Sequence, residues 1–234
     1  KKFPELNKDI KIHLYEKSAF LKKIQKQKLK SKYIKWIKNF NSIKDGPVIF
    51  FGNEFFDAIP IKQFSNINNE LFEKCYLVKN EDNIIEKFIK VNKNDIARIK
   101  VFETLKKLKF IEFPKKGFLE LNSMIKKISK LSGGILLIDY GYLNGNSTNT
   151  IQAVMDNKKI SVDTMLRHLG KADITSLVNF SLLKEYFFKN NLKVKKIVTQ
   201  RFFLERMGII ERAKILEKKM TNAEKKYMRE TLVR

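Results

Sequence analysis

The sequence is poor in residues that build cross-links and metal sites: among 234 residues there are one cysteine, Cys75, and two histidines, His13 and His168. One cysteine excludes an internal disulfide and a cysteine-based zinc site, and two histidines do not make a metal cluster. This composition fits a reducing compartment. We therefore expect a protein of the cytoplasm or of an organelle interior.

The sequence also lacks long apolar runs and a secretory start. No run approaches the about 20 apolar residues that a membrane span needs, and no signal-peptide pattern opens the chain. The chain begins Lys1-Lys2-Phe3-Pro4, without methionine, and enters a strand almost directly, so we expect an N-terminally truncated chain. Hydrophobic residues make up 43% of it, which is enough for an α/β domain with a core.

Acidic residues are scarce: 25 Asp and Glu stand against 49 Lys and Arg, a formal charge of +24. Such an excess is compatible with nucleic acid, an anionic membrane or an acidic partner. However, the excess is mostly lysine, is spread along the chain and accompanies many Ile and Asn, as codon bias produces. We therefore favour a solvated basic surface over a dedicated nucleic-acid site.

Two continuous apolar runs, 48–51 and 135–138, are bounded by turn residues, the pattern of parallel strands buried on both faces. Periodicity predicts further strands at 10–14, 33–36, 151–154 and 194–198, and helices at 19–29, 119–131, 180–189 and from 202 to the end, broken at Gly208. Alternating strands and helices predict an open α/β sheet, which binds ligands beyond the carboxyl ends of its strands.

The middle of the chain is less regular. Strand-like pieces at 61–64, 71–78 and 84–89 precede a basic helical stretch that runs through Lys109. We interpret residues 61–117 as an inserted β-rich subdomain. The core then comprises 1–60 and 118–234, and the second part carries the C-terminal helices.

Polar residues that follow the predicted strands are the candidate site. Glu16 ends an early strand, where an acid can bind ribose hydroxyls; the alternative is an ordinary exposed glutamate. Asn53, Glu54 and Asp57 follow the run 48–51, and their carboxylates match a guanidinium group. The alternative is that Asn53 caps a helix whose first turn carries both acids.

Three further positions have weaker signals. Asp139 follows the second buried run, next to a glycine that permits close backbone approach. Asp173 or Thr175 is expected either to cap a helix or to line a cleft. His168 is more often an ordinary histidine than a base.

Five segments stand in a recognisable order: 13–18 (HLYEKS), 53–64 (NEFFDAIPIKQF), 137–142 (LIDYGY), 172–175 (ADIT) and 198–209 (VTQRFFLERMGI). Together they resemble the signature blocks of the MidA family of class I S-adenosylmethionine-dependent methyltransferases, which are similar to complex I assembly arginine methyltransferases. The chain departs from the family pattern in two ways. It lacks the glycine-rich turn that precedes the Glu16 block, and it has Asn179 where an aspartate is usual.

The resemblance implies a Rossmann-like methyltransferase sheet, here without its N-terminal strand, with S-adenosylmethionine as cofactor. For mitochondrial members it implies symmetric ω-N dimethylation of an arginine on a complex I subunit in the matrix; bacterial members act in the cytoplasm on less defined substrates. By position, Glu16 matches the acid that holds the cofactor ribose. Asn53, Glu54 and Asp57 match the loop facing the methyl acceptor.

We therefore expect Glu54 and Asp57 to orient an acceptor guanidinium, with Asn53 contacting the cofactor or the acceptor. Two alternatives remain open: a methyltransferase of RNA or another acceptor, and a non-catalytic assembly factor that keeps the fold. A basic nucleic-acid-binding module without activity ranks third, because no helix-turn-helix, RNA-recognition or zinc pattern appears.

Overall fold

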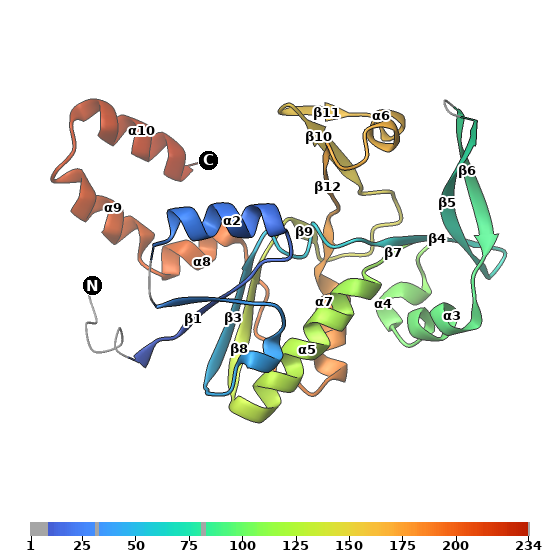
Figure 1. The fold of residues 1–234 in the computed structure, drawn as a ribbon, viewed down its shortest axis with the longest axis horizontal. Helices are drawn as coiled ribbons and strands as arrows, with labels where there is room; N and C mark the ends of the chain where they lie inside the picture. Colours follow the sequence, from blue (N-terminus) through green and yellow to red (C-terminus); the bar gives the residue numbers. More distant parts are fainter. Residues whose placement is uncertain (1–8, 31–32, 81–82, 234) are drawn as a thin grey trace.

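The computed structural model describes residues 9–30, 33–80 and 83–233. The opening residues 1–8, on which the expectation of a truncated start rests, lie outside these ranges. Strands and helices alternate along most of the chain, as predicted for an α/β protein (Figure 1). No helix in the described ranges is long and apolar enough to cross a membrane.

Two pairs of parallel strands form the centre of the fold. They are β1 (Ile12–Tyr15) with β2 (Ile34–Ile37), and β3 (Val48–Asn53) with β8 (Gly133–Ile138). The 3-10 helix η1 (Phe40–Ser42) joins the pairs, because the Phe40 ring lies 4.7 Å from that of Tyr15 and 5.1 Å from that of Phe50. Both pairs therefore share one aromatic core.

Three helices belong to this centre: α2 (Ala19–Lys28), α5 (Lys115–Leu131) and α7 (Phe180–Lys189). Helix α2 begins where predicted, since the Ser18 hydroxyl accepts a hydrogen bond from the Leu21 amide. Helix α5 packs along β3 and β8 (Figure 1). At the start of β8, Gly133 is required, because a Cβ there would lie 1.8 Å from the carbonyl oxygen of Val48 on β3.

The segment expected to be a β-rich insertion forms a four-stranded antiparallel sheet in the order β6-β5-β4-β7. Its elements are β4 (Lys62–Ile67), β5 (Glu70–Asn80), β6 (Asn83–Lys90), α3 (Lys93–Lys100), α4 (Glu103–Lys106) and β7 (Phe110–Phe113). The sequence analysis missed β7, which pairs with β4, so the chain enters and leaves this sheet through neighbouring strands. The proposed boundaries at 60 and 117 stay a prediction.

A second small sheet follows β8. It has the order β11-β10-β12, with strands β10 (Gln152–Met155), β11 (Lys158–Ile160) and β12 (Asp173–Thr175), and it carries helix α6 (Val162–Arg167). Short strands β9 (Gly141–Tyr142) and β13 (Val178–Asn179) pair in parallel beneath it. Asn179 caps α7 by accepting a hydrogen bond from the Leu182 amide, so an asparagine serves at this family position.

The C-terminal helices are α8 (Gln200–Arg206), α9 (Ile209–Glu217) and α10 (Asn222–Val233). The predicted break lies at Gly208, whose φ of 82° is left-handed. Helices α9 and α10 extend away from the sheets, at the left of the view (Figure 1). The strand predicted at 194–198 is wrong: this segment is irregular and pairs with no strand of the described chain.

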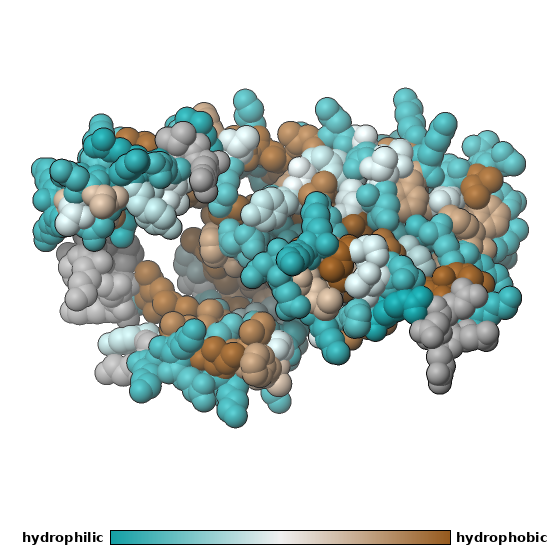
Figure 2. All heavy atoms as spheres, turned by 90° about the horizontal axis from the view of Figure 1, so that it is seen from above, coloured by the Kyte–Doolittle hydropathy of each residue, from teal (hydrophilic) through white to brown (hydrophobic). Residues whose placement is uncertain are grey.

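The prediction that residues 48–51 are buried on both faces is also wrong. Phe50 is 9% exposed, whereas Ile49 and Phe51, on the opposite face of β3, are 78% and 65% exposed. The reason is that no described element covers this face. Viewed from above, hydrophobic residues line a hollow on the side of the molecule that carries the C-terminal helices (Figure 2).

Candidate functional site

The carboxyl ends of β3 and β8 meet at one edge of the sheet. Asn53 lies opposite Ile138 in the parallel register, and the Glu54 amide donates a hydrogen bond to the Ile138 carbonyl at 2.9 Å. Asn53 and Asp139 therefore leave the sheet side by side. Ligands of open α/β sheets bind at this edge.

Asp139 shapes the loop that follows β3. Its Oδ2 accepts hydrogen bonds from the amides of Phe55, at 3.2 Å, and Phe56, at 2.7 Å. Glu54 starts this turn in a left-handed conformation, with φ of 48°. No helix follows Asn53, so the alternative that Asn53 is a helix cap is wrong. The physical reason is that the Asp139 carboxylate accepts hydrogen bonds from the Phe55 and Phe56 amides, which would be free in the first turn of a helix.

Asp57 is the buried member of this loop. It is 8% exposed, and its Oδ1 has no hydrogen-bond partner among the described residues. Burial raises the pKa of Asp57 and the negative charge of Asp139 raises it further, against a lowering hydrogen bond from the Ala58 amide. Because an unsatisfied buried carboxylate costs free energy, this oxygen is suited to a positively charged donor.

Helix α5 packs against the loop that follows β3. Phe56 is 3% exposed, and its ring occupies the space beside Gly117, where a Cβ would lie 2.5 Å from the ring. A glycine at this position of α5 therefore lets Phe56 enter the core. Since Asp57 is the next residue, this packing fixes where its carboxylate lies.

Two exposed carboxylates complete the group. Glu54 and Asp173 both raise the pKa of Asp57 through their negative charges. We call Glu54, Asp57, Asp139 and Asp173 the acidic cluster. In the described part of the chain, none of the four forms an ion pair with a lysine or arginine, although the protein carries 49 such residues.

The acidic cluster is not arranged for a metal ion. Within the described ranges, no group of three or more His, Cys, Asp and Glu side chains is placed to hold one. Carboxylates also match the fork of a guanidinium ion.

Glu16 lies at the end of β1, as predicted, and is oriented by its neighbours. Its Oε1 accepts a hydrogen bond from the Ser18 amide at 2.8 Å, and its Oε2 accepts one from Gln25 Nε2 at 3.1 Å. Gln25 is itself held by Trp36 Nε1 at 2.9 Å. No hydrogen bond among the described residues joins Glu16 to the acidic cluster. Its contact with a cofactor ribose stays a prediction.

The weaker candidates from the sequence lie in different places in the structure. Asp173 and Thr175 lie in strand β12, so the expectation that one of them caps a helix is wrong. His168 ends α6, where its amide bonds the Thr164 carbonyl, and it is not part of the acidic cluster. Of the sequence candidates, the structure thus brings together Asn53, Glu54, Asp57, Asp139 and Asp173.

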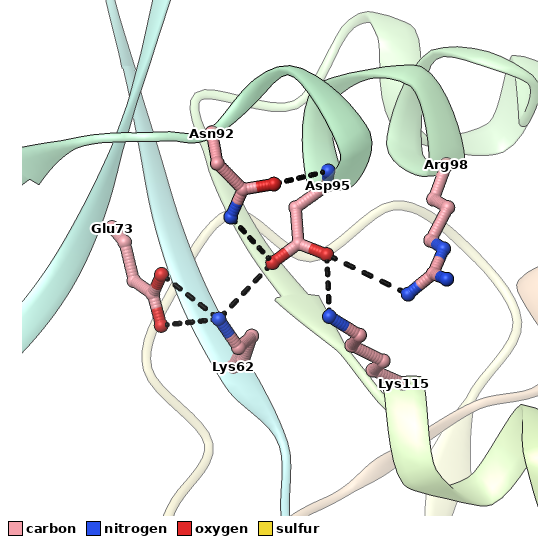
Figure 3. Close-up of polar contacts among 6 residues, drawn as sticks. All are labelled: Lys62, Glu73, Asn92, Asp95, Arg98 and Lys115. Carbon is pink, nitrogen blue, oxygen red and sulfur yellow. Dashed lines mark hydrogen bonds and ion pairs between the residues drawn. The ribbon is translucent and has the colours of Figure 1, made fainter.

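A buried ion network that the sequence analysis missed lies where the sheet β6-β5-β4-β7 meets α5 (Figure 3). Asp95 is 1% exposed; its carboxylate lies 2.7 Å from Lys115 Nζ and 3.1 Å from Lys62 Nζ. Glu73 binds Lys62 in turn at 2.9 Å. Hydrogen bonding from Lys115 is the main cause that lowers the pKa of Asp95 to about 2. The sequence signal that could have indicated this site was the spacing of Asn92 and Asp95, which form a capping pair at the start of α3.

This network supports the candidate site from the far side of the loop. Lys62 begins β4, shortly after Asp57, and Lys115 begins α5, two residues before Gly117. The same carboxylate therefore fixes both the exit of the loop and the helix on which Phe56 packs.

Parallel strands with acidic side chains beyond their carboxyl ends define the chain as an α/β protein, a class whose ligands bind at this edge of the sheet. Its relatives specify the class further. The chain belongs to the family described as "Putative S-adenosyl-L-methionine-dependent methyltransferase", whose model matches residues 1–198. This confirms the predicted family and the predicted cofactor.

Two curated relatives carry related names. The "Protein arginine methyltransferase NDUFAF7 homolog, mitochondrial" of Caenorhabditis elegans is 29% identical over 225 residues, covering 91% of this chain and 50% of the relative. The "Protein arginine methyltransferase NDUFAF7, mitochondrial" of Danio rerio is 26% identical over 183 residues, covering 78% and 42%. The chain thus spans about half the length of the curated relatives it matches.

A solved structure shares the fold. A Burkholderia thailandensis protein crystallised with S-adenosyl-homocysteine superposes with a TM-score of 0.67 at 15% identity, covering 92% of this chain and 56% of that one. A native structure from the same organism gives 0.66 at 16% identity. This likeness confirms the α/β methyltransferase fold.

Proposed function

We propose that this protein is an S-adenosylmethionine-dependent methyltransferase whose acceptor is an arginine side chain of another protein. The observation that carries the proposal is the unpartnered, buried oxygen of Asp57 within the acidic cluster. A guanidinium ion supplies the donors that this oxygen lacks, and its planar fork suits more than one carboxylate. The names of the curated relatives support the same acceptor.

The described residues fit the cofactor that the family description names. Glu16 presents a half-buried carboxylate in a fixed orientation, and each of its oxygens has a lone pair left for a ribose hydroxyl. Asn53 stands exposed at the end of β3, next to the acceptor loop. We assign Glu16 to the cofactor and Asn53 to the boundary between cofactor and acceptor.

When bound, S-adenosylmethionine supplies a methyl group on a positively charged sulfur. Methyl transfer to nitrogen is an in-line displacement, so the protein contributes mainly alignment and exclusion of water. Glu54 and Asp57 hold the guanidinium and keep its positive charge on the nitrogens that do not attack. Glu54, which is exposed, accepts the proton that the methylated nitrogen loses and passes it to solvent.

The client that we propose is a subunit of respiratory complex I, as the resemblance to the MidA family implies. Both relatives are named mitochondrial, which supports the mitochondrial matrix as the place of action. A second candidate acceptor is RNA, because the formal charge of +24 favours polyanion binding. RNA binding that weakens steeply with salt, together with methyl transfer to RNA, would favour this candidate.

The test is tritiated methyl transfer to the candidate client by protein expressed from the complete gene. Glu54→Gln should lower turnover by about 100-fold or more, because it removes a charge placed at the reacting group, while cofactor affinity changes less than about twofold. Glu230→Gln, an exposed glutamate on α10, is the matched control. Equal losses of turnover and cofactor affinity would assign Glu54 to binding; no transfer by the wild type would favour the assembly factor.

A further inference from the structure

We propose that Asp173, on strand β12, forms the outer part of the cation site and selects a positively charged planar acceptor over a neutral one. This inference rests on the proposed function and extends it to a residue outside the loop that follows β3. Asp173 belongs to the small sheet β11-β10-β12, which is separate from the sheet that carries Asn53, Glu54 and Asp57.

Backbone contacts fix the end of β12 against the acidic loop. The Ser176 amide donates a hydrogen bond to the Asp57 carbonyl at 3.0 Å, and the Leu177 amide donates one to Thr150 Oγ1 at 3.0 Å. Thr150 in turn donates to Glu112 on β7. The segment that carries Asp173 is therefore attached at two points on its C-terminal side.

The four carboxylates of the acidic cluster differ in exposure in a consistent order. Glu54 and Asp173 are exposed, Asp139 is half-buried and Asp57 is buried. Asp173 lies three residues before Ser176, whose amide binds the Asp57 carbonyl, and the negative charge of Asp173 contributes to the raised pKa of Asp57. A cation that arrives from solvent therefore meets the outer carboxylates first and the unpartnered oxygen of Asp57 last.

The charge of the whole protein makes the outer carboxylates necessary. With a formal charge of +24, the surface repels a cationic peptide, and the small sheet adds the exposed lysines 158, 159 and 171. Asp173 is the carboxylate on this sheet that belongs to the acidic cluster and has no ion pair among the described residues. It provides local attraction where the surrounding field is repulsive.

The ligand that fits this arrangement is a guanidinium ion. It has five N–H donors in a plane, so two or more carboxylates can bind it from different sides. An inner carboxylate at Asp57 and an outer one at Asp173 supply acceptors from two different sheets. A neutral urea group of the same shape, as in citrulline, gains the hydrogen bonds but not the charge attraction.

The test compares Asp173→Asn with Asp156→Asn in protein expressed from the complete gene. Asp156 is an exposed aspartate in the turn between β10 and β11, so the control removes the same charge from the same sheet. Binding of an arginine peptide and of the matching citrulline peptide is measured by calorimetry with S-adenosyl-homocysteine present. KM and kcat are measured with the arginine peptide.

We expect Asp173→Asn to weaken arginine-peptide binding about tenfold and to raise KM by a similar factor, with kcat and citrulline-peptide binding changed less than about twofold. Asp156→Asn should leave all four values within about twofold. Arginine-peptide affinity that Asp173→Asn leaves unchanged would overturn the inference. Peptide binding that responds as expected while the wild type transfers no methyl group would refute the proposed function and keep the cation site.

Discussion

A buried carboxylate without a hydrogen-bond partner is costly, because the lost interactions with water are not replaced. In Asp57 one oxygen, Oδ1, is in this situation among the described residues, and burial together with the charges of Asp139, Glu54 and Asp173 acts against the ionised form and raises the pKa. The cost persists as long as no cation is bound. At the scale of the residue, the site therefore gives up stability in the free protein to gain affinity for its ligand.

Neutralising Asp57 should stabilise the free protein. The folded-state pKa of Asp57 lies above its ordinary value of 3.8, so the free energy of unfolding falls as pH rises past that value. We expect Asp57→Asn to be about 1–2 kcal/mol more stable than wild type near pH 8, with no difference below about pH 3.5. Urea denaturation at both pH values measures this. Asp156→Asn serves as the exposed control, and a destabilised Asp57→Asn near pH 8 would contradict the account.

The elements that position this residue could be predicted in part. Local signals were sufficient for α2 and α7, where a capping side chain precedes an amphipathic run. They failed where tertiary partners decide. Residues 194–198 have a strand pattern but no neighbouring strand, and β7 becomes a strand because β4 lies beside it.

The candidate site, too, could be predicted only in part from local sequence signals. That polar residues after β3 and β8 share one edge follows from parallel pairing, so Asn53 and Asp139 were predictable neighbours. That Asp139 binds the loop amides, and thereby prevents a helix, depends on side-chain geometry that no local pattern encodes. The proximity of Asp173 depends on how the small sheet docks, which spacing along the chain does not reveal.

At the scale of elements, Asp95 should stabilise the junction of α3, β4 and α5 in a pH-dependent way. Its pKa is lowered to about 2, mainly by Lys115, so its stabilisation is fully present above about pH 4 and is lost as pH falls through about 2. Asp95→Asn should lower the free energy of unfolding by about 3 kcal/mol near pH 7, because it leaves two lysines without their buried partner.

Chemical denaturation of both proteins between about pH 2 and pH 7 checks this. The matched control is Asp45→Asn, which breaks the exposed ion pair with Lys11 and should change stability very little. A deficit in Asp95→Asn that is equally large at both ends of the pH range would show that shape, and not charge, is what Asp95 contributes.

At the scale of the whole molecule, charge and exposed apolar surface have different distributions. Lysines are spread over the chain, whereas the four carboxylates of the acidic cluster, which form no ion pair among the described residues, lie around the loop that follows β3. The side chains of Ile49 and Phe51 form an exposed apolar face of β3. Phe50, on the opposite face of the same strand, packs in the buried core. A basic protein with four carboxylates grouped at one sheet edge can attract a cation there while its overall charge repels cations elsewhere.

The central claim is that the carboxylate of Asp57 receives a cationic acceptor, and arginine-peptide affinity measured by calorimetry between about pH 4 and pH 8 tests it most directly. The account predicts that wild-type affinity rises with pH as Asp57 ionises, reaches about ten times that of Asp57→Asn near pH 8, and converges with the variant near pH 4. Equal affinities of the two proteins at every pH would contradict it.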